Sequence, residues 1–162
     1  MKVFVLDEKL ARDFIPDVST LAIRIYDSFP PNNGSLPLQA SDNWNSVLEY
    51  CFDDIEIDLY PDEYLKKNLP IWKEKYSLFD EILAKKIIDD FAPYCEAKQI
   101  MLHCHAGWSR SPAVILGLQQ VFGFDIEWAS GRTKRIMEAK LSENSCGNAH
   151  VYTLIAAQTP SR

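Results

Sequence analysis

Short runs of apolar residues, each followed by polar or turn-forming residues, divide the chain into predicted strands. Lys2–Leu6 and Ser46–Phe52 have this pattern. Thr20–Tyr26 alternates between apolar and polar positions, as a half-buried strand does, and its apolar positions are Leu21, Ile23 and Ile25. Ile100–Leu102 is continuously apolar, which indicates a strand buried on both faces. The chain is therefore expected to contain a sheet.

Apolar residues at steps of three and four predict the helices. Such a stripe runs through Ser77–Tyr94, whose first residue is the expected N-cap, and its members are Phe79, Ile82, Leu83, Ile87 and Phe91. An apolar helix is expected from Pro112 onward, because proline is tolerated in a first helical turn. Further helices are expected at Phe124–Leu141 and Asn148–Ala157, and a short helical piece at Asp7–Phe14.

The order of these elements predicts an α/β fold. Strands that alternate with helices favour a central, mostly parallel sheet flanked by helices. At 162 residues the chain is expected to form a single domain, residues 1–162. Residues 28–43 are rich in Pro, Asn, Gly and Ser and predict a loop long enough to serve as a lid or rim.

The most informative stretch joins the strand at Ile100–Leu102 to the helix at Pro112, and it reads H-C-H-A-G-W-S-R-S. A loop that opens a helix presents unpaired N–H groups and the positive end of a helix dipole, so it attracts anions. Arg110 at its end would hold two phosphate oxygens at once. The same positive field favours the thiolate of Cys104, which would then attack phosphorus as a nucleophile.

The other residues of this loop have expected supporting roles. The Ser111 hydroxyl would donate a hydrogen bond to the Cys104 sulfur, and His103 would orient the loop from behind. Gly107 permits a sharp turn and a close approach of the backbone to the ligand. Phosphate would be bound by the residues of the loop itself, which are His105, Ala106, Gly107, Trp108, Ser109 and Arg110.

This stretch resembles the H-C-x-x-G-x-x-R-[ST] signature of the cysteine-dependent protein tyrosine phosphatases. Its half that reads G-W-S-R-S-P-A is most similar to the compact dual-specificity branch and its small phage and bacterial relatives. The resemblance implies a protein tyrosine phosphatase-like fold. It also implies a metal-free hydrolase without cofactors, which removes phosphate from phosphotyrosine, or from phosphoserine and phosphothreonine as well, through a phosphocysteine. The implied partner is a phosphorylated protein or peptide.

A phosphatase of this kind also needs a general acid to protonate the departing oxygen, and then a base to activate water. Related small phosphatases carry this aspartate just after a strand upstream of the cysteine, and the run F-D-D-I at Phe52–Ile55 resembles that element. Asp54 is expected at the acid position, with Asp53 as the alternative. Aspartate also commonly caps turns, so either residue could have only that role.

The spacing from Asp54 to Cys104 is longer than the compact family leads one to expect. An insertion at residues 56–76 accounts for the extra chain. Because this insertion follows the predicted acid directly, Asp58 and Asp62 also stay open as candidates for the acid.

Composition limits the other classes of function. A net charge of −6 argues against nucleic acid as a partner, and 47% hydrophobic residues exclude a disordered chain. No run approaches the ~18 apolar residues of a membrane span, and the N-terminus lacks the basic start of a signal peptide. The four cysteines form no C-x-x-C pair, so no metal site is predicted. A cytoplasmic protein with no membrane partner is expected.

Several residues bear on specificity. The loop holds Arg110 as its one strong cation, whereas phosphoinositide phosphatases of this superfamily tend to place lysines there, so a peptide-like substrate is favoured. Trp108 either contributes to specificity or packs beneath the loop. The cluster of Arg132, Lys134 and Arg135 is either a basic rim for phosphorylated substrates or a solvated helix face.

Two alternatives accompany this reading. Cys51 could trap an oxidised Cys104 as a disulfide, or it could be a small buried residue of a strand. The chain as a whole could be a catalytically weak pseudophosphatase that binds phosphorylated partners. Sulfur transfer and arsenate reduction also use cysteine-headed anion loops, but those loops do not usually show G-x-S-R-S.

Overall fold

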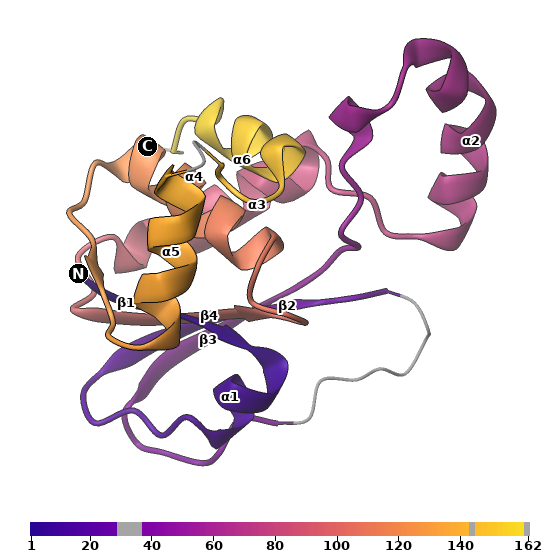
Figure 1. Cartoon of the computed structure of the whole chain (residues 1–162). Helices are drawn as coiled ribbons and strands as arrows, with labels where there is room; N and C mark the ends of the chain where they lie inside the picture. Colours follow the sequence, from indigo (N-terminus) through magenta and orange to yellow (C-terminus); the bar gives the residue numbers. More distant parts are fainter. Residues whose placement is uncertain (29–36, 143–144, 161–162) are drawn as a thin grey trace.

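The computed structural model describes residues 1–28, 37–142 and 145–160, and within these ranges five strands pair into one all-parallel sheet (Figure 1). The strands are β1 (Lys2–Asp7), β2 (Thr20–Tyr26), β3 (Trp44–Cys51), β4 (Gln99–Cys104) and β5 (Glu127–Trp128). Their order across the sheet is β3-β2-β4-β1-β5. The predicted α/β fold with a mostly parallel sheet is therefore confirmed.

Helices cover both faces of the sheet (Figure 1). α1 (Glu8–Asp13) lies on one face. The other face carries α3 (Glu81–Phe91), α4 (Arg110–Phe122), α5 (Arg132–Ser142) and α6 (Ala149–Ala156). Short 3-10 turns occur at η1 (Ile57–Leu59) and η2 (Ala92–Tyr94).

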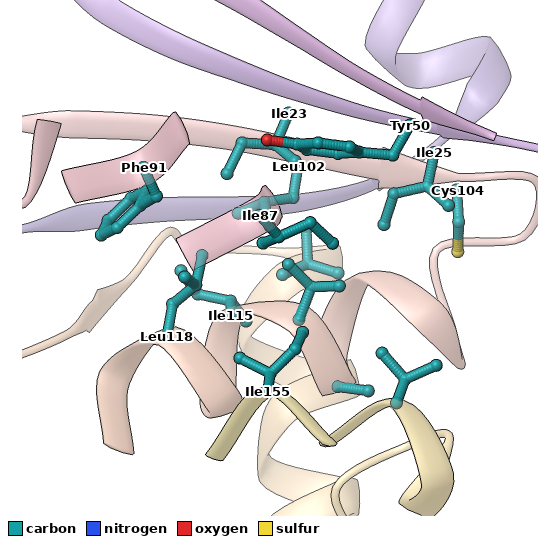
Figure 2. Close-up of a cluster of buried hydrophobic side chains, with 14 of the residues drawn as sticks. Ile23, Ile25, Tyr50, Ile87, Phe91, Leu102, Cys104, Ile115, Leu118 and Ile155 are labelled. Carbon is teal, nitrogen blue, oxygen red and sulfur yellow. The ribbon is translucent and has the colours of Figure 1, made fainter. Parts of the chain in front are cut away.

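The main hydrophobic core lies between the sheet and these four helices (Figure 2). Its fully buried side chains include Ile23 and Leu102 from the strands and Ile87, Ile115 and Ile155 from the helices. A second cluster under α1 covers the opposite face of the sheet, and its buried members are Leu6, Ala11, Ala22 and Met101. Because both faces are covered, the prediction that β2 is half-buried is wrong.

α3 begins later than the sequence pattern predicts. Asp80 is its N-cap and accepts a hydrogen bond from the Leu83 N–H at 2.8 Å. The predicted N-cap, Ser77, instead donates its backbone N–H to Asp53 at 2.8 Å, which holds it outside the helix. Ile82 does not belong to the buried stripe and is 80% exposed, because the face that meets the core carries Ala84, Ile87, Ile88 and Phe91.

The predicted helix at Phe124–Leu141 is wrong in its first part. The Glu127 N–H donates to the Met1 carbonyl at 2.9 Å, and the Ala129 N–H donates to the Val3 carbonyl at 2.9 Å. This segment therefore extends the sheet as β5 at the edge of β1, and α5 begins only at Arg132.

The predicted insertion at 56–76 contains η1 and a further helix, α2 (Asp62–Lys75), which stands apart from the sheet (Figure 1). α2 has no buried residue. The aromatic rings of Tyr60, Tyr64 and Trp72 pack on one another instead, with centroids 5.1 to 6.0 Å apart. Residues 29–36 of the predicted loop lie outside the described residues. None of the described helices is long and apolar enough to cross a membrane.

Candidate active site

The predicted site residues gather at one edge of the sheet. Because the strands are parallel, their carboxyl ends lie at the same edge, where open α/β sheets bind ligands. Cys104 is the last residue of β4, while Asp27 directly follows β2 and Asp54 follows β3. Residues 105–109 connect Cys104 to Arg110, the first residue of α4.

Cys104 is nearly buried, with 2% of its surface exposed, and lies at the margin of the main core beside Ile25 (Figure 2). Its sulfur accepts a hydrogen bond from the Ser111 hydroxyl at 2.9 Å. Ser111 is itself fully buried in the first turn of α4. The predicted contact between hydroxyl and sulfur is therefore present, and it would stabilise a thiolate at this position.

Arg110 is held from one side of its guanidinium group. Nη1 lies 2.8 Å from a carboxylate oxygen of Asp27 and donates to the Phe52 carbonyl at 2.6 Å. Nε is buried and has no hydrogen-bond partner among the residues that the structure describes. A buried donor without a partner is costly, so Nε is a donor suited to a ligand oxygen. Sequence reasoning missed Asp27, whose available signal is its place directly after a parallel strand.

The backbone of the loop turns its carbonyl groups toward the surrounding protein. The carbonyls of His105, Ala106 and Ser109 each accept a hydrogen bond from outside the loop. The donors are Glu8 N–H at 3.2 Å, Arg132 Nη2 at 3.1 Å and Asn148 N–H at 3.3 Å, in that order. In a trans peptide the N–H of the next residue points the opposite way. The loop amides therefore point away from these donors.

Gly107 allows the loop to approach the end of β1. Its φ is +67°, in the left-handed region, and a Cβ at this position would lie 2.4 Å from the Leu6 carbonyl oxygen. A larger residue would therefore have to displace backbone. The sharp turn predicted at Gly107 is confirmed, and the close approach that the structure shows is to the backbone of β1.

Trp108 lies on the surface of the loop and not beneath it. Its side chain is 46% exposed, and the Lys140 amine lies 4.7 Å from the centre of its ring, within cation–π range. His105 is also exposed and lies 3.6 Å from the Glu8 carboxylate.

The predicted basic cluster on α5 divides between two roles. Arg132 contacts the loop at the Ala106 carbonyl and pairs with Asp7 at 3.1 Å. Lys134 instead lies 3.8 Å from Glu138 one turn along the same helix, on a solvated face. Arg132 therefore supports the loop between β4 and α4, a role that the sequence analysis did not foresee for it.

The structure brings Asp54 to the loop. Its Oδ1 accepts one hydrogen bond from the Ser109 hydroxyl at 2.8 Å and another from Asn148 Nδ2 at 2.9 Å. Asp54 as a whole residue is exposed. Burial and the Asp54 carboxylate raise the pKa of the neighbouring Glu56.

Asp53 faces a different set of groups. It is 7% exposed, and its carboxylate accepts hydrogen bonds from the backbone N–H groups of Ser28 at 3.0 Å and Ser77 at 2.8 Å. It also contacts the Ser28 hydroxyl. These bonds join the segment that follows β2, at Ser28, to the segment that precedes α3, at Ser77. Asp53 therefore has a structural role, of the kind given as the alternative to an acid for the aspartates of this run.

The two remaining acid candidates belong to the insertion. Asp58 lies 3.2 Å from the His150 ring nitrogen Nδ1, and Asp62 lies in the first turn of α2. His150 also lies 3.2 Å from the Phe79 carbonyl, so it joins η1 to the start of α3. The contacts of Asp58 therefore indicate a role in holding the insertion against α6.

His103 lies in the buried strand β4, directly before Cys104, and the hydrogen bond of its ring goes to Arg24 and not to the loop that it was predicted to orient. It is 1% exposed, and its Nε2 accepts a hydrogen bond from Arg24 Nε at 3.2 Å. Burial, together with the positive charge of Arg24, lowers its pKa to about 4. The ring is therefore neutral at pH 7 and serves as an acceptor for Arg24.

The neutral His103 predicts a pH-dependent stability. In the unfolded chain its pKa returns to 6.5. Over the range from pH 6.5 down to about 4, the unfolded state therefore binds a proton more readily than the folded state does. The free energy of unfolding should thus fall by about 3 kcal/mol over this range. Urea unfolding at pH 7 and pH 5 should show a larger loss for the wild type than for His103→Gln. Equal losses in the two proteins would remove His103 as the cause.

The geometry does not favour Cys51 as a redox partner of Cys104. β2 lies between β3 and β4, so two strand spacings, roughly 9 to 10 Å, separate the two residues. A disulfide needs Cα atoms within about 7 Å. The Cys51 side chain is exposed, whereas Cys104 belongs to the main core. Of the two alternatives for Cys51, the geometry favours the strand residue over the trapping disulfide, but Cys51 is exposed and not buried as that alternative predicted.

Comparison of the chain with models of protein families, with curated proteins and with solved structures found no match. Among the described residues no group of three His, Cys, Asp or Glu side chains is arranged to hold a metal ion. The function of the protein is therefore inferred from the signature and from the geometry of these residues.

Proposed function

We propose that this protein hydrolyses phosphate monoesters through a phosphocysteine formed on Cys104. The observation that carries the proposal is the pairing of two features at one loop. The Cys104 sulfur accepts a hydrogen bond from the Ser111 hydroxyl at 2.9 Å, and Arg110 at the end of the same loop is anchored by Nη1, while its Nε has no partner in the part of the chain that the structure describes. A prepared nucleophile and a prepared oxyanion donor are the two parts that this chemistry needs.

The loop offers a site for the three terminal oxygens of a phosphate group. Its amides point away from the donors that hold the His105 and Ala106 carbonyls, and α4 directs its N-terminus toward the loop. Arg110 adds a positive charge and a planar fork of donors. Uncatalysed hydrolysis of monoesters is among the slowest known reactions, so preorganised donors would supply most of the acceleration.

The first step is attack of the Cys104 thiolate on phosphorus. The sulfur–phosphorus bond forms while the bond from phosphorus to the ester oxygen breaks, and the Asp54 carboxylic acid transfers its proton to that oxygen. In the second step Asp54, now a carboxylate, accepts a proton from the water that attacks the phosphocysteine. The thiolate leaves, stabilised by the Ser111 hydroxyl, and phosphate is released.

The substrate that we favour is a phosphorylated protein or peptide in the cytoplasm that carries phosphotyrosine, with phosphoserine and phosphothreonine as the further candidates. The loop sequence itself contains Arg110 as its one strong cation, which suits a single phosphate group better than a multiply phosphorylated headgroup. The exposed ring of Trp108 on the surface of the same loop suits contact with a peptide.

The direct test is turnover of para-nitrophenyl phosphate and of a phosphotyrosyl peptide by the wild-type protein with EDTA present. We expect release of phosphate from both, and acid quenching during turnover should trap phosphate on Cys104. If neither compound turns over although the phosphopeptide still binds, the chain is a phosphate-recognition module.

Asp54 and Asp53 form a matched pair for testing the acid. Asp54→Asn should lower kcat for the phosphotyrosyl peptide by roughly 10²- to 10³-fold, since general acid catalysis contributes about that much. Asp53→Asn should mainly lower the free energy of unfolding, by about 1 to 3 kcal/mol, because Asp53 accepts buried hydrogen bonds from Ser28 and Ser77. Steady-state kinetics and urea unfolding of both variants check this. A larger loss of turnover in Asp53→Asn would reverse the assignment.

A further inference from the structure

Asn148 connects three parts of the site. It is fully buried at the N-cap of α6, where its Oδ1 accepts the Val151 N–H at 3.0 Å. Its Nδ2 donates to Asp54 Oδ1 at 2.9 Å, and its backbone N–H donates to the Ser109 carbonyl at 3.3 Å. One side chain therefore caps a helix and holds the proposed acid, while its backbone holds the phosphate-binding loop.

The turn that carries Asn148 is packed tightly against the loop. Gly147 has a φ of +88°, and a Cβ at this position would lie 2.3 Å from the Ser109 carbonyl oxygen. No side chain fits between the two segments, so the start of α6 and the loop form one packed unit. The position of Nδ2 is thereby fixed relative to Cys104 and Arg110, which belong to the same loop.

The hydrogen bonds to Asp54 distinguish its two oxygens. Oδ1 accepts from both Ser109 Oγ and Asn148 Nδ2, which occupies both of its lone-pair sites. A proton on the carboxyl group would therefore sit on Oδ2. The two donors thus set which oxygen delivers the proton as well as where the carboxyl group lies.

We infer that Asn148 is a positioning residue for the general acid, which it orients so that Oδ2 carries the transferable proton. This inference depends on the proposed function and deepens it. Asn148 has no contact with substrate in this account and acts through Asp54. Its effect should therefore appear only where proton transfer to the leaving group limits the rate.

The test compares two esters that differ in their need for an acid. Asn148→Ser keeps a good helix cap but is too short to reach Asp54. We expect it to lower kcat/KM roughly tenfold for phenyl phosphate, whose leaving oxygen needs a proton, in line with loss of a hydrogen bond to a charged group. For 2,4-dinitrophenyl phosphate, which leaves without a proton, the change should be less than about twofold.

Two controls separate positioning from folding. Asp80→Ser makes a corresponding exchange at the N-cap of α3, where the side chain caps Leu83, and should leave the ratio of the two esters unchanged. In an Asp54→Asn background, Asn148→Ser should have no further effect on phenyl phosphate, because the group that it positions is gone. Urea unfolding of each variant checks that the fold is kept.

The outcomes are distinct. An equal loss of activity toward both esters, or a further loss in the Asp54→Asn background, would overturn the role of Asn148 while leaving the phosphatase proposal intact. Absence of turnover of either ester by the wild type would overturn the proposed function, and this inference with it, before any variant is needed.

Discussion

Cys104→Ser should abolish turnover of para-nitrophenyl phosphate, by at least about four orders of magnitude, while the loop still binds phosphate. The serine hydroxyl is a poor nucleophile at neutral pH because it is not ionised. Its hydrogen-bond partner at this position, Ser111, is not a base that could activate it. Arg110, the loop amides and Gly107 keep their contacts, since the exchange changes a single atom. Loss of chemistry with retention of the anion site is the expected signature of a nucleophile.

The measurement combines steady-state kinetics with calorimetric titration of inorganic phosphate. Cys95→Ser is a matched control, because Cys95 follows η2 at the opposite end of β4 from the loop and its exchange should leave turnover unchanged. Residual activity of Cys104→Ser within tenfold of the wild type would show that Cys104 is not the nucleophile. Loss of phosphate binding along with turnover would instead mean that the sulfur is needed to hold the loop in shape.

Much of the fold was predictable because buried parallel strands are continuous apolar runs, as at Ile100–Leu102. The errors arose where distant residues decide the outcome. Residues 127–128 form a strand because the N–H groups of Glu127 and Ala129 donate to the Met1 and Val3 carbonyls of β1, and the local sequence of this segment does not indicate that a sheet edge is available there. Ile82 fits the apolar spacing of α3, yet it is exposed because the face of the helix is set by the sheet beneath it.

The site residues show the same contrast between what a local sequence pattern predicts and what distant residues decide. Cys104, Arg110 and Ser111 lie within eight residues of one another, so their chemistry is readable as a motif. Asp27 and Asn148 are not, because they reach the site through the parallel sheet and through the packing of α6. The sequence could place Asp54 and Asp53 after the same strand, but only their hydrogen bonds show that Asp54 faces the loop and that Asp53 is a buried anchor.

Arg110→Lys should lower kcat/KM by about 10³-fold, although it keeps the positive charge. The guanidinium uses Nη1 for Asp27 and the Phe52 carbonyl and retains Nε for a phosphate oxygen. A lysine ammonium is a compact point charge. It cannot hold Asp27 with one nitrogen and offer a second nitrogen to a phosphate oxygen, as the planar guanidinium can. The ammonium group would pair with the Asp27 carboxylate and leave the phosphate oxygens without their cation.

The pattern of the loss identifies the role of Arg110. If Arg110 binds the phosphoryl group that every substrate shares, as proposed, Arg110→Lys should impair turnover of phenyl phosphate and 2,4-dinitrophenyl phosphate equally, whereas Asp54→Asn should impair mainly that of the first. Asp27→Asn is the matched control for the anchor: its amide oxygen can still accept from Nη1, so a loss of only about tenfold is expected. Activity of Arg110→Lys within tenfold of the wild type would mean that the positive charge alone is enough to bind the phosphate. A loss that depends on the leaving group would mean that Arg110 acts in protonation of the leaving group and not in binding of the phosphoryl oxygens.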